Sequence, residues 1–189
     1  GNHELWVQDE DFDCSLTKFD AITELCKFCG VHADIFEMPD ISFVPLFSWY
    51  DFSFGEPDRH LRRAWRDFRA CSWPDHLSGA RDVSDYFLNL NLEKLSTMNK
   101  TVISYSHFLP RIDVMPERIP VERRNVYPVL GSEALGVQVK QLNPAIHVYG
   151  HSHVNQSVLL DDVCYVNNAF AYPRESRIAR KQLHCIYES

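Results

Sequence analysis

Three short polar clusters contain most of the residues in this chain that could perform chemistry. They read GNHE at residues 1–4, SHF at 106–108 and GHSH at 150–153. Neutral imidazoles are the commonest metal ligands in proteins, and histidines combined with an amide oxygen and carboxylates suit manganese, iron or zinc better than calcium or magnesium. The three clusters therefore predict a binding site for divalent metal ions.

The second and third clusters each follow an apolar, β-rich segment. TVISY at 101–105 precedes His107, and AIHVY at 145–149 precedes His151 and His153. In open α/β sheets, ligands bind beyond the carboxyl ends of the strands, where loops can converge. Two histidines at positions i and i+2 can point the same way, while Gly150 lets the backbone approach closely. A lone histidine at the end of a strand can simply cap or pack, but the joint pattern favours a functional site.

Together the clusters resemble the signature of the calcineurin-like metallophosphoesterases. That signature is an ordered series of Asp-x-His, Gly-Asp, Gly-Asn-His-Asp/Glu, a lone His after a strand, and a final Gly-His-x-His. GNHE at 1–4, His107 and GHSH at 150–153 match the last three members in order. The resemblance implies a layered α/β/β/α sandwich. It also implies a phosphomonoesterase or phosphodiesterase in which a pair of divalent ions, manganese, iron or zinc, activates water.

The resemblance also implies a role for each matched side chain. Asn2, His107 and His151 would ligate one metal ion, and His153 would ligate the other. His3 would not be a ligand but would stabilise a phosphoryl oxygen or protonate the leaving group. Glu4 would orient His3 through a hydrogen bond, as carboxylates beside a working imidazole do.

The chain departs from the family pattern at its start. In the family, the Asp-x-His and Gly-Asp elements precede Gly-Asn-His, whereas here nothing precedes Gly1. Ligands of the first metal and the carboxylate that bridges the pair belong to those elements. We therefore expect the carboxyl-terminal part of a phosphoesterase domain, incomplete at its N-terminal side and inactive without the residues before Gly1. The alternative is a non-catalytic fragment or scaffold module that retains part of the fold.

Apolar periodicity predicts the elements that must position these residues. Helical spacing predicts helices over 15–29, 84–98 and 132–142, and a further helix through Leu61–Phe68. β-rich runs predict strands at 31–36, 41–50, 101–107, 145–153, 157–160, 163–168 and 182–188. His147, inside one of these runs, is expected to be a sheet residue. Helices that alternate with strands indicate a mixed α/β sandwich. The length of 189 residues favours one domain over 1–189, with a helix-loop insertion at about 51–98.

Composition narrows the classes of partner. A net charge of −7 argues against a non-specific nucleic-acid binder, and no apolar run approaches the roughly 20 residues that cross a bilayer. Six scattered cysteines in a chain of this size favour reduced thiols and a cytoplasmic protein. The expected partner is a phosphate-ester substrate, and the pattern says nothing about oligomeric state.

Overall fold

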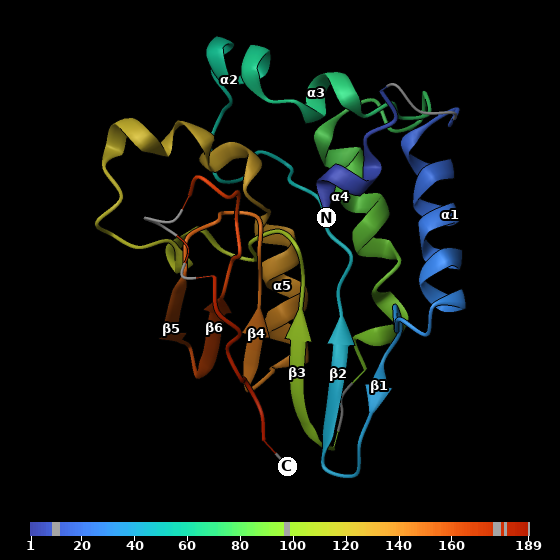
Figure 1. Ribbon diagram of the computed structural model, residues 1–189, viewed down its shortest axis with the longest axis vertical. Coiled ribbons are helices and arrows are strands. Elements are labelled where there is room, and N and C mark those ends of the chain that lie inside the picture. The colour runs from blue at the N-terminus through green and yellow to red at the C-terminus, as the bar shows by residue number, and fades with distance from the viewer. Residues whose placement is uncertain (9–11, 97–98, 176–178, 180, 189) are drawn as a thin grey trace.

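The computed structural model describes residues 1–8, 12–96, 99–175, 179 and 181–188. A six-stranded sheet runs through the molecule in the order β1-β2-β3-β4-β6-β5 (Figure 1). Its strands are β1 Phe36–Glu37, β2 Ile41–Pro45, β3 Thr101–Tyr105, β4 Ile146–Val148, β5 Gln156–Leu160 and β6 Val163–Asn167. The four central strands are parallel. The outer strand β1 pairs antiparallel with β2, and the outer strand β5 pairs antiparallel with β6. The parallel strands therefore end at the same edge of the sheet.

Helices flank the sheet, so the predicted mixed α/β class is confirmed. The α-helices are α1 Ser15–Phe28, α2 Arg59–Ala64, α3 Asp67–Ala70, α4 Ala80–Asn89 and α5 Glu133–Leu142. Short 3₁₀ helices are η1 Asn2–Leu5, η2 Leu92–Lys94, η3 Ile112–Val114 and η4 Val121–Val129. The second sheet that the resemblance implies has no strand among the described residues.

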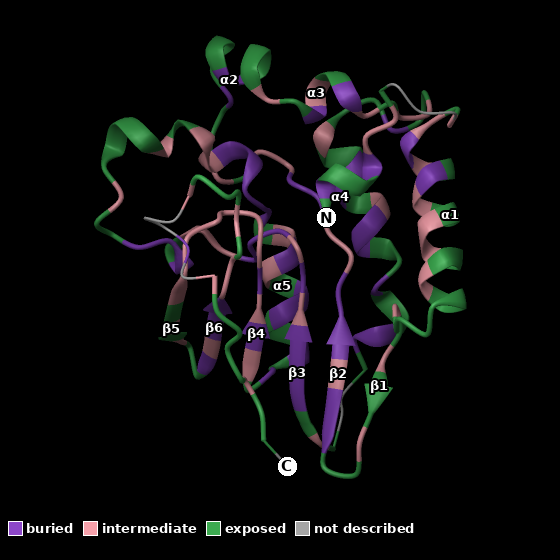
Figure 2. Ribbon diagram, viewed as in Figure 1, coloured by how far each residue is buried: buried purple, intermediate pink, exposed green. Residues whose placement is uncertain are grey.

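Two apolar clusters hold these elements together. One packs α5, through Leu135 and Val139, against the sheet residues Val44 and Val102. The other is rich in aromatic rings and includes Phe108, whose ring lies 5.2 Å from that of Trp49. Figure 2 shows the buried strands β2 and β3 at the centre of the molecule. Because Phe108 is buried next to His107, the aromatic cluster fixes the loop that carries this histidine.

The C-terminal segment crosses a face of the sheet and does not join it. The run 182–188 is predicted from its sequence as a closing strand, and this prediction is wrong: the structure has no strand there. Instead the Tyr187 ring rests 6.4 Å from the ring of Phe43 in β2, and the segment passes in front of the strands (Figure 1). An apolar β-rich run cannot distinguish pairing at a sheet edge from packing on a sheet face.

Several element boundaries differ from the predicted ones. Of the run 31–36, only Phe36 is in a strand, and the run 41–50 is a strand only as far as Pro45. Helix α4 begins at Ala80, because the Asp82 carboxylate caps the backbone N–H of Gly79. It ends before the buried Asn91, whose side-chain amide pairs with the backbone of Phe47. Residues 97–98 of the predicted helix lie outside the described residues.

The sequence predicts reduced cysteines and no membrane-spanning segment. All six cysteines are free thiols. Among the described helices, none combines the length and the apolar character that a bilayer span requires.

Candidate metal centre

Three donor atoms converge beyond the carboxyl ends of β3 and β4. His107 Nε2 lies 3.0 Å from Asn2 Oδ1 and 3.0 Å from His151 Nδ1. Ligand atoms bonded to one ion at about 2.1 Å stand about 3.0–3.4 Å apart, the edge of an octahedron or tetrahedron. The other ring nitrogen of His151, Nε2, is 3.1 Å from the carbonyl oxygen of Val129. Because a carbonyl only accepts, Nε2 carries the proton and the lone pair of Nδ1 faces the centre.

Local backbone geometry brings these side chains together. Gly1 lies so close to His107 that a Cβ there would stand 2.6 Å from the imidazole, so a larger residue would displace this ring. The backbone N–H of Gly150 donates to the carbonyl of His107 at 3.0 Å, which ties the two loops together. His151 and His153 both adopt left-handed backbone conformations, with φ of 59° and 57°. Such strain in non-glycine residues clusters at functional sites.

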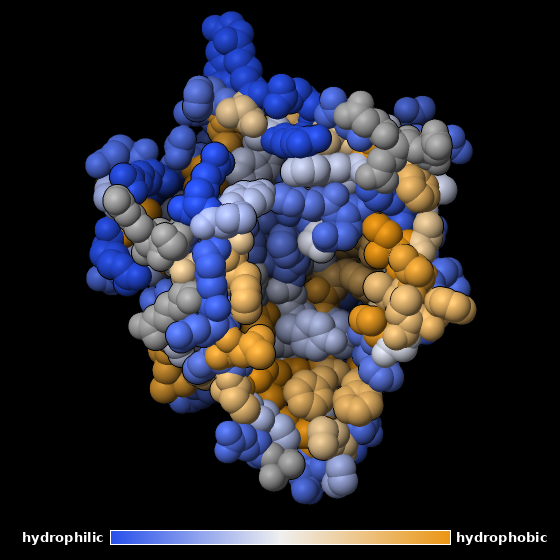
Figure 3. Space-filling view, viewed as in Figure 1, coloured by the Kyte–Doolittle hydropathy of each residue, from blue (hydrophilic) through white to orange (hydrophobic). Residues whose placement is uncertain are grey.

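All six residues predicted for the site line one cleft of about 1020 Å³: Asn2, His3, Glu4, His107, His151 and His153. Figure 3 shows a hollow on this face of the molecule, with hydrophilic side chains above it and apolar ones below. The structure therefore brings the three sequence clusters to one place, across separations of more than a hundred positions along the chain.

His3 stands on the wall of this cleft, apart from the three donor atoms. Its ring packs against that of Trp6 at 4.0 Å, and its Nε2 is 3.5 Å from the hydroxyl of Tyr172. The Glu4 carboxylate accepts from the amino group of Gly1, and no hydrogen bond joins it to His3 among the described residues. The orienting role of Glu4 stays a prediction.

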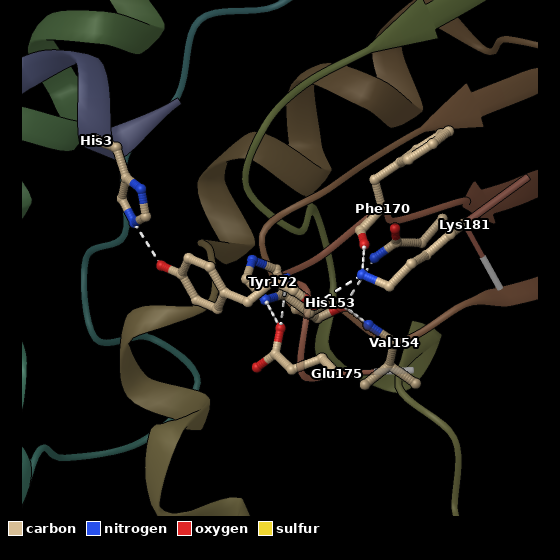
Figure 4. Close-up of polar contacts among 9 residues, drawn as sticks. His3, His153, Val154, Phe170, Tyr172, Glu175 and Lys181 are labelled. Atoms are coloured by element: carbon tan, nitrogen blue, oxygen red, sulfur yellow. Dashed lines mark hydrogen bonds and ion pairs between the residues drawn. The ribbon is translucent and has the colours of Figure 1, made fainter. Parts of the chain in front are cut away.

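His153 is held by a carboxylate of its own. Its Nδ1 is 2.9 Å from Glu175 Oε2, an oxygen that also accepts from the backbone N–H of Tyr172 (Figure 4). Lys181 donates to the carbonyls of Phe170 and Tyr172 and so holds this segment in place. A carboxylate on one imidazole nitrogen orients the ring and leaves the other nitrogen for a metal.

Burial keeps the imidazoles of the centre neutral. It lowers the pKa of His151 to about 3 and holds the pKa of His107 well below its ordinary value, with the repulsion that a protonated His151 would exert as the second cause. Burial also lowers the pKa of His3, against the opposing effect of the Asp67 charge. Neutral imidazoles present the lone pair that a metal requires.

The chemistry of the donor set fits a divalent ion of the manganese, iron or zinc type. The set consists of two imidazole nitrogens and one amide oxygen, with His107 Nε2 lying 3.0 Å from each of the other two atoms. Across the part of the chain that the structure describes, no group of three or more His, Cys, Asp or Glu side chains could hold a metal ion. The ligand that neutralises the charge of such an ion would therefore have to be a group other than these three residues.

Comparison with known proteins supports the fold. No protein-family model matches the chain, and no curated protein matches it significantly. Among solved structures, the phosphopantetheinyl hydrolase PptH from Mycobacterium tuberculosis is 20% identical, with a TM-score of 0.72 over 94% of this chain and 69% of that chain. The protein TT1561 of Thermus thermophilus is 14% identical, with a TM-score of 0.41 over 83% of this chain and 59% of that chain. The likeness to PptH shows that the two chains share a fold.

Sequence reasoning missed three residues of the cleft. Tyr172 and Glu175 come from the segment after β6, and Asp67 begins α3 in the predicted insertion. None of them belongs to a recognisable motif. A lone acidic or aromatic residue has no spacing pattern, so only its contacts in the folded chain reveal it.

Proposed function

We propose that this chain forms the catalytic part of a metal-dependent phosphoric-ester hydrolase, a phosphomonoesterase or phosphodiesterase. The observation that supports it best is the position of His107 Nε2, which lies 3.0 Å from Asn2 Oδ1 and 3.0 Å from His151 Nδ1. Without a metal, a proton on His107 Nε2 can be donated to these two acceptors. A cation in place of that proton would let all three atoms direct a lone pair at it.

The residues of the cleft divide into two groups of ligands. Asn2, His107 and His151 would hold one divalent ion, manganese, iron or zinc, and His153 would hold a second one, with Glu175 orienting its ring. A pair of such ions supplies hydroxide from bound water and neutralises the charge of the phosphate. The chain's own part is to keep the His107 and His151 imidazoles neutral, which their burial achieves. It also orients the rings of His151 and His153, through the Val129 carbonyl and the Glu175 carboxylate.

His3 acts on the phosphate from the cleft wall. Its packing on Trp6 limits its ring orientation, and its Nε2 faces the cleft near Tyr172. From there it donates a hydrogen bond to a phosphoryl oxygen or a proton to the leaving oxygen. Because it is not one of the converging donors, its loss should leave metal binding intact.

The cleft has the size and charge for an anionic ester larger than phosphate itself. Its volume is about 1020 Å³, and Arg66 and Arg174 are among the residues that line it. Guanidinium groups recognise phosphate oxygens by paired hydrogen bonds. PptH is a phosphopantetheinyl hydrolase, so a phosphopantetheinyl ester is the first natural substrate to test on this protein. A non-catalytic scaffold module would not require candidate metal ligands from three separate segments to lie together, and this argues against that alternative.

The test compares His3→Ala with His151→Ala in the full-length natural protein. With bis(p-nitrophenyl) phosphate and p-nitrophenyl phosphate under saturating Mn²⁺, His3→Ala should lower turnover by roughly 10²–10⁴-fold and keep its metal content. His151→Ala should lose metal and turnover together. His60→Ala removes an exposed imidazole from α2 and controls for the loss of a histidine. If the wild type hydrolyses neither ester, nor a phosphopantetheinyl ester, the proposal fails.

A further inference from the structure

Asp67 is a buried carboxylate that touches one of the proposed metal ligands. It begins α3 and is only 3% exposed. Both of its oxygens accept from Asn2 Nδ2, at 2.9 and 3.1 Å. The indole N–H of Trp6 donates to Oδ1 at 2.6 Å, and that of Trp65 donates to Oδ2 at 2.8 Å. Three neutral donors thus satisfy a group whose burial would otherwise be costly.

A break in the predicted helix through Leu61–Phe68 creates this arrangement. The helix stops at Ala64, and Trp65 takes an extended conformation, with φ −72° and ψ 119°, before α3 starts. This turn lets the Trp65 indole reach Asp67, two positions further along the chain. The same indole ring lies edge-on to the imidazole of His151, at 5.7 Å between centroids. Trp65 therefore contacts both the carboxylate and one of the proposed metal ligands.

The contact with Asp67 decides which way the Asn2 carboxamide faces. An asparagine amide can be rotated by 180°, which exchanges its acceptor oxygen and its donor nitrogen. A carboxylate only accepts, so the nitrogen must face Asp67 and the oxygen must face away from it. The oxygen then lies 3.0 Å from His107 Nε2. In the opposite orientation, two acceptors would meet at Asp67 and an N–H₂ group would point into the metal centre.

We infer that Asp67 is a positioning residue that holds the Asn2 oxygen toward the metal centre, an inference that rests on the proposed function. Its own oxygens are taken by three donors, so it acts through Asn2 and not as a ligand. Partners of this kind behind a metal ligand typically contribute 10–100-fold to metal affinity. Asp67 lies in the segment 51–98, outside every motif that the sequence presents.

The experiment exchanges the two side chains in the full-length protein and measures Mn²⁺ affinity by calorimetry, with the melting temperature of each metal-free variant recorded alongside. Asp67→Asn should weaken Mn²⁺ binding by roughly 10–100-fold. Asn2→Asp should also bind poorly, because it places two carboxylates side by side. The double variant should recover most of the affinity, since an amide at position 67 can donate to a carboxylate at position 2. Asp58→Asn, which alters the cap of α2 nearby, is the matched control and should bind like the wild type.

Each other outcome decides against the inference or against the proposed function. If the two substitutions simply add in the double variant, or if Asp67→Asn binds Mn²⁺ normally, Asp67 does not position Asn2. Affinity that falls only in step with melting temperature indicates a purely structural carboxylate and has the same consequence. A wild type that binds no Mn²⁺ refutes the proposed function, and NMR then tests the contact alone. The Asn2 side-chain amide protons should exchange slowly in the metal-free wild type and in Asp58→Asn, and fast in Asp67→Ala; equal rates overturn the inference.

Discussion

Replacing the buried His147 by asparagine should make the fold less sensitive to acid. His147 lies in β4, fully buried, between the hydroxyls of Ser104 at 2.8 Å and Ser106 at 3.1 Å. The Ser106 hydroxyl donates to the carbonyl of Phe108, so its oxygen accepts from His147 Nε2–H, and Nδ1 accepts from Ser104. The neutral imidazole is therefore satisfied, and a second proton on it would be buried without compensation.

The size of the effect follows from the two pKa values of this imidazole. Burial lowers the pKa of His147 from 6.5 to about 3 in the folded protein. Between these values the unfolded chain binds a proton and the folded chain does not, so stability falls as pH decreases from 6.5 towards 3. At pH 5.0 the unfolded imidazole is about 1.5 pH units below its pKa, which corresponds to about 2 kcal/mol at roughly 1.36 kcal/mol per unit. The same contribution is close to zero at pH 7.5.

Urea unfolding at pH 7.5 and pH 5.0, in the presence of EDTA, measures this contribution. His147→Asn should be less stable than the wild type at pH 7.5, because it leaves a void and changes the pairing with the serines. Between the two pH values, however, it should lose about 2 kcal/mol less than the wild type does. His107 and His151 add acid sensitivity to both proteins equally, since burial lowers their pKa values too. His60→Asn, on the exposed surface of α2, should follow the wild type. Equal losses in His147→Asn and wild type would refute the assignment of a buried neutral His147.

Three further predictions concern caps, close packing and metal. At the start of α5, the Ser132 hydroxyl accepts from the backbone N–H of Leu135 at 3.1 Å. Ser132→Ala should therefore lower the free energy of unfolding in urea by about 1 kcal/mol, and an unchanged midpoint would contradict the cap. Gly131→Ala should cost about 1–3 kcal/mol in the same assay, because its Cβ would lie 1.9 Å from the carbonyl oxygen of Leu109; wild-type stability would contradict this close approach. Mn²⁺ at about 100 times its dissociation constant should stabilise the full-length wild type by about 2.7 kcal/mol in thermal unfolding and should stabilise His151→Ala much less. Equal stabilisation of both proteins would mean that His151 is not a ligand.

Much of the fold could be read directly from local patterns. The periodicity of Ser15–Phe28, Thr101–Tyr105 and Glu133–Leu142 matches the observed α1, β3 and α5 closely, because a helix or a buried strand shows its period within a few residues. The candidate ligands His107 and His151 could be predicted for a related reason. Each follows a parallel strand, and parallel strands end at one edge of their sheet.

Only the tertiary structure decided the features that depend on distant contacts. Helix α4 ends near Asn91, whose side chain pairs with the backbone of Phe47, 44 positions away. The run 182–188 lies across the sheet, where the Tyr187 ring packs against Phe43. Asp67 contacts Asn2, 65 positions away in the sequence. Nothing in the residue type distinguishes this buried aspartate from one on an exposed surface. A local pattern encodes backbone period and side-chain chemistry. It does not encode which buried donor a carboxylate will find, because that choice is made by the packing of the whole chain.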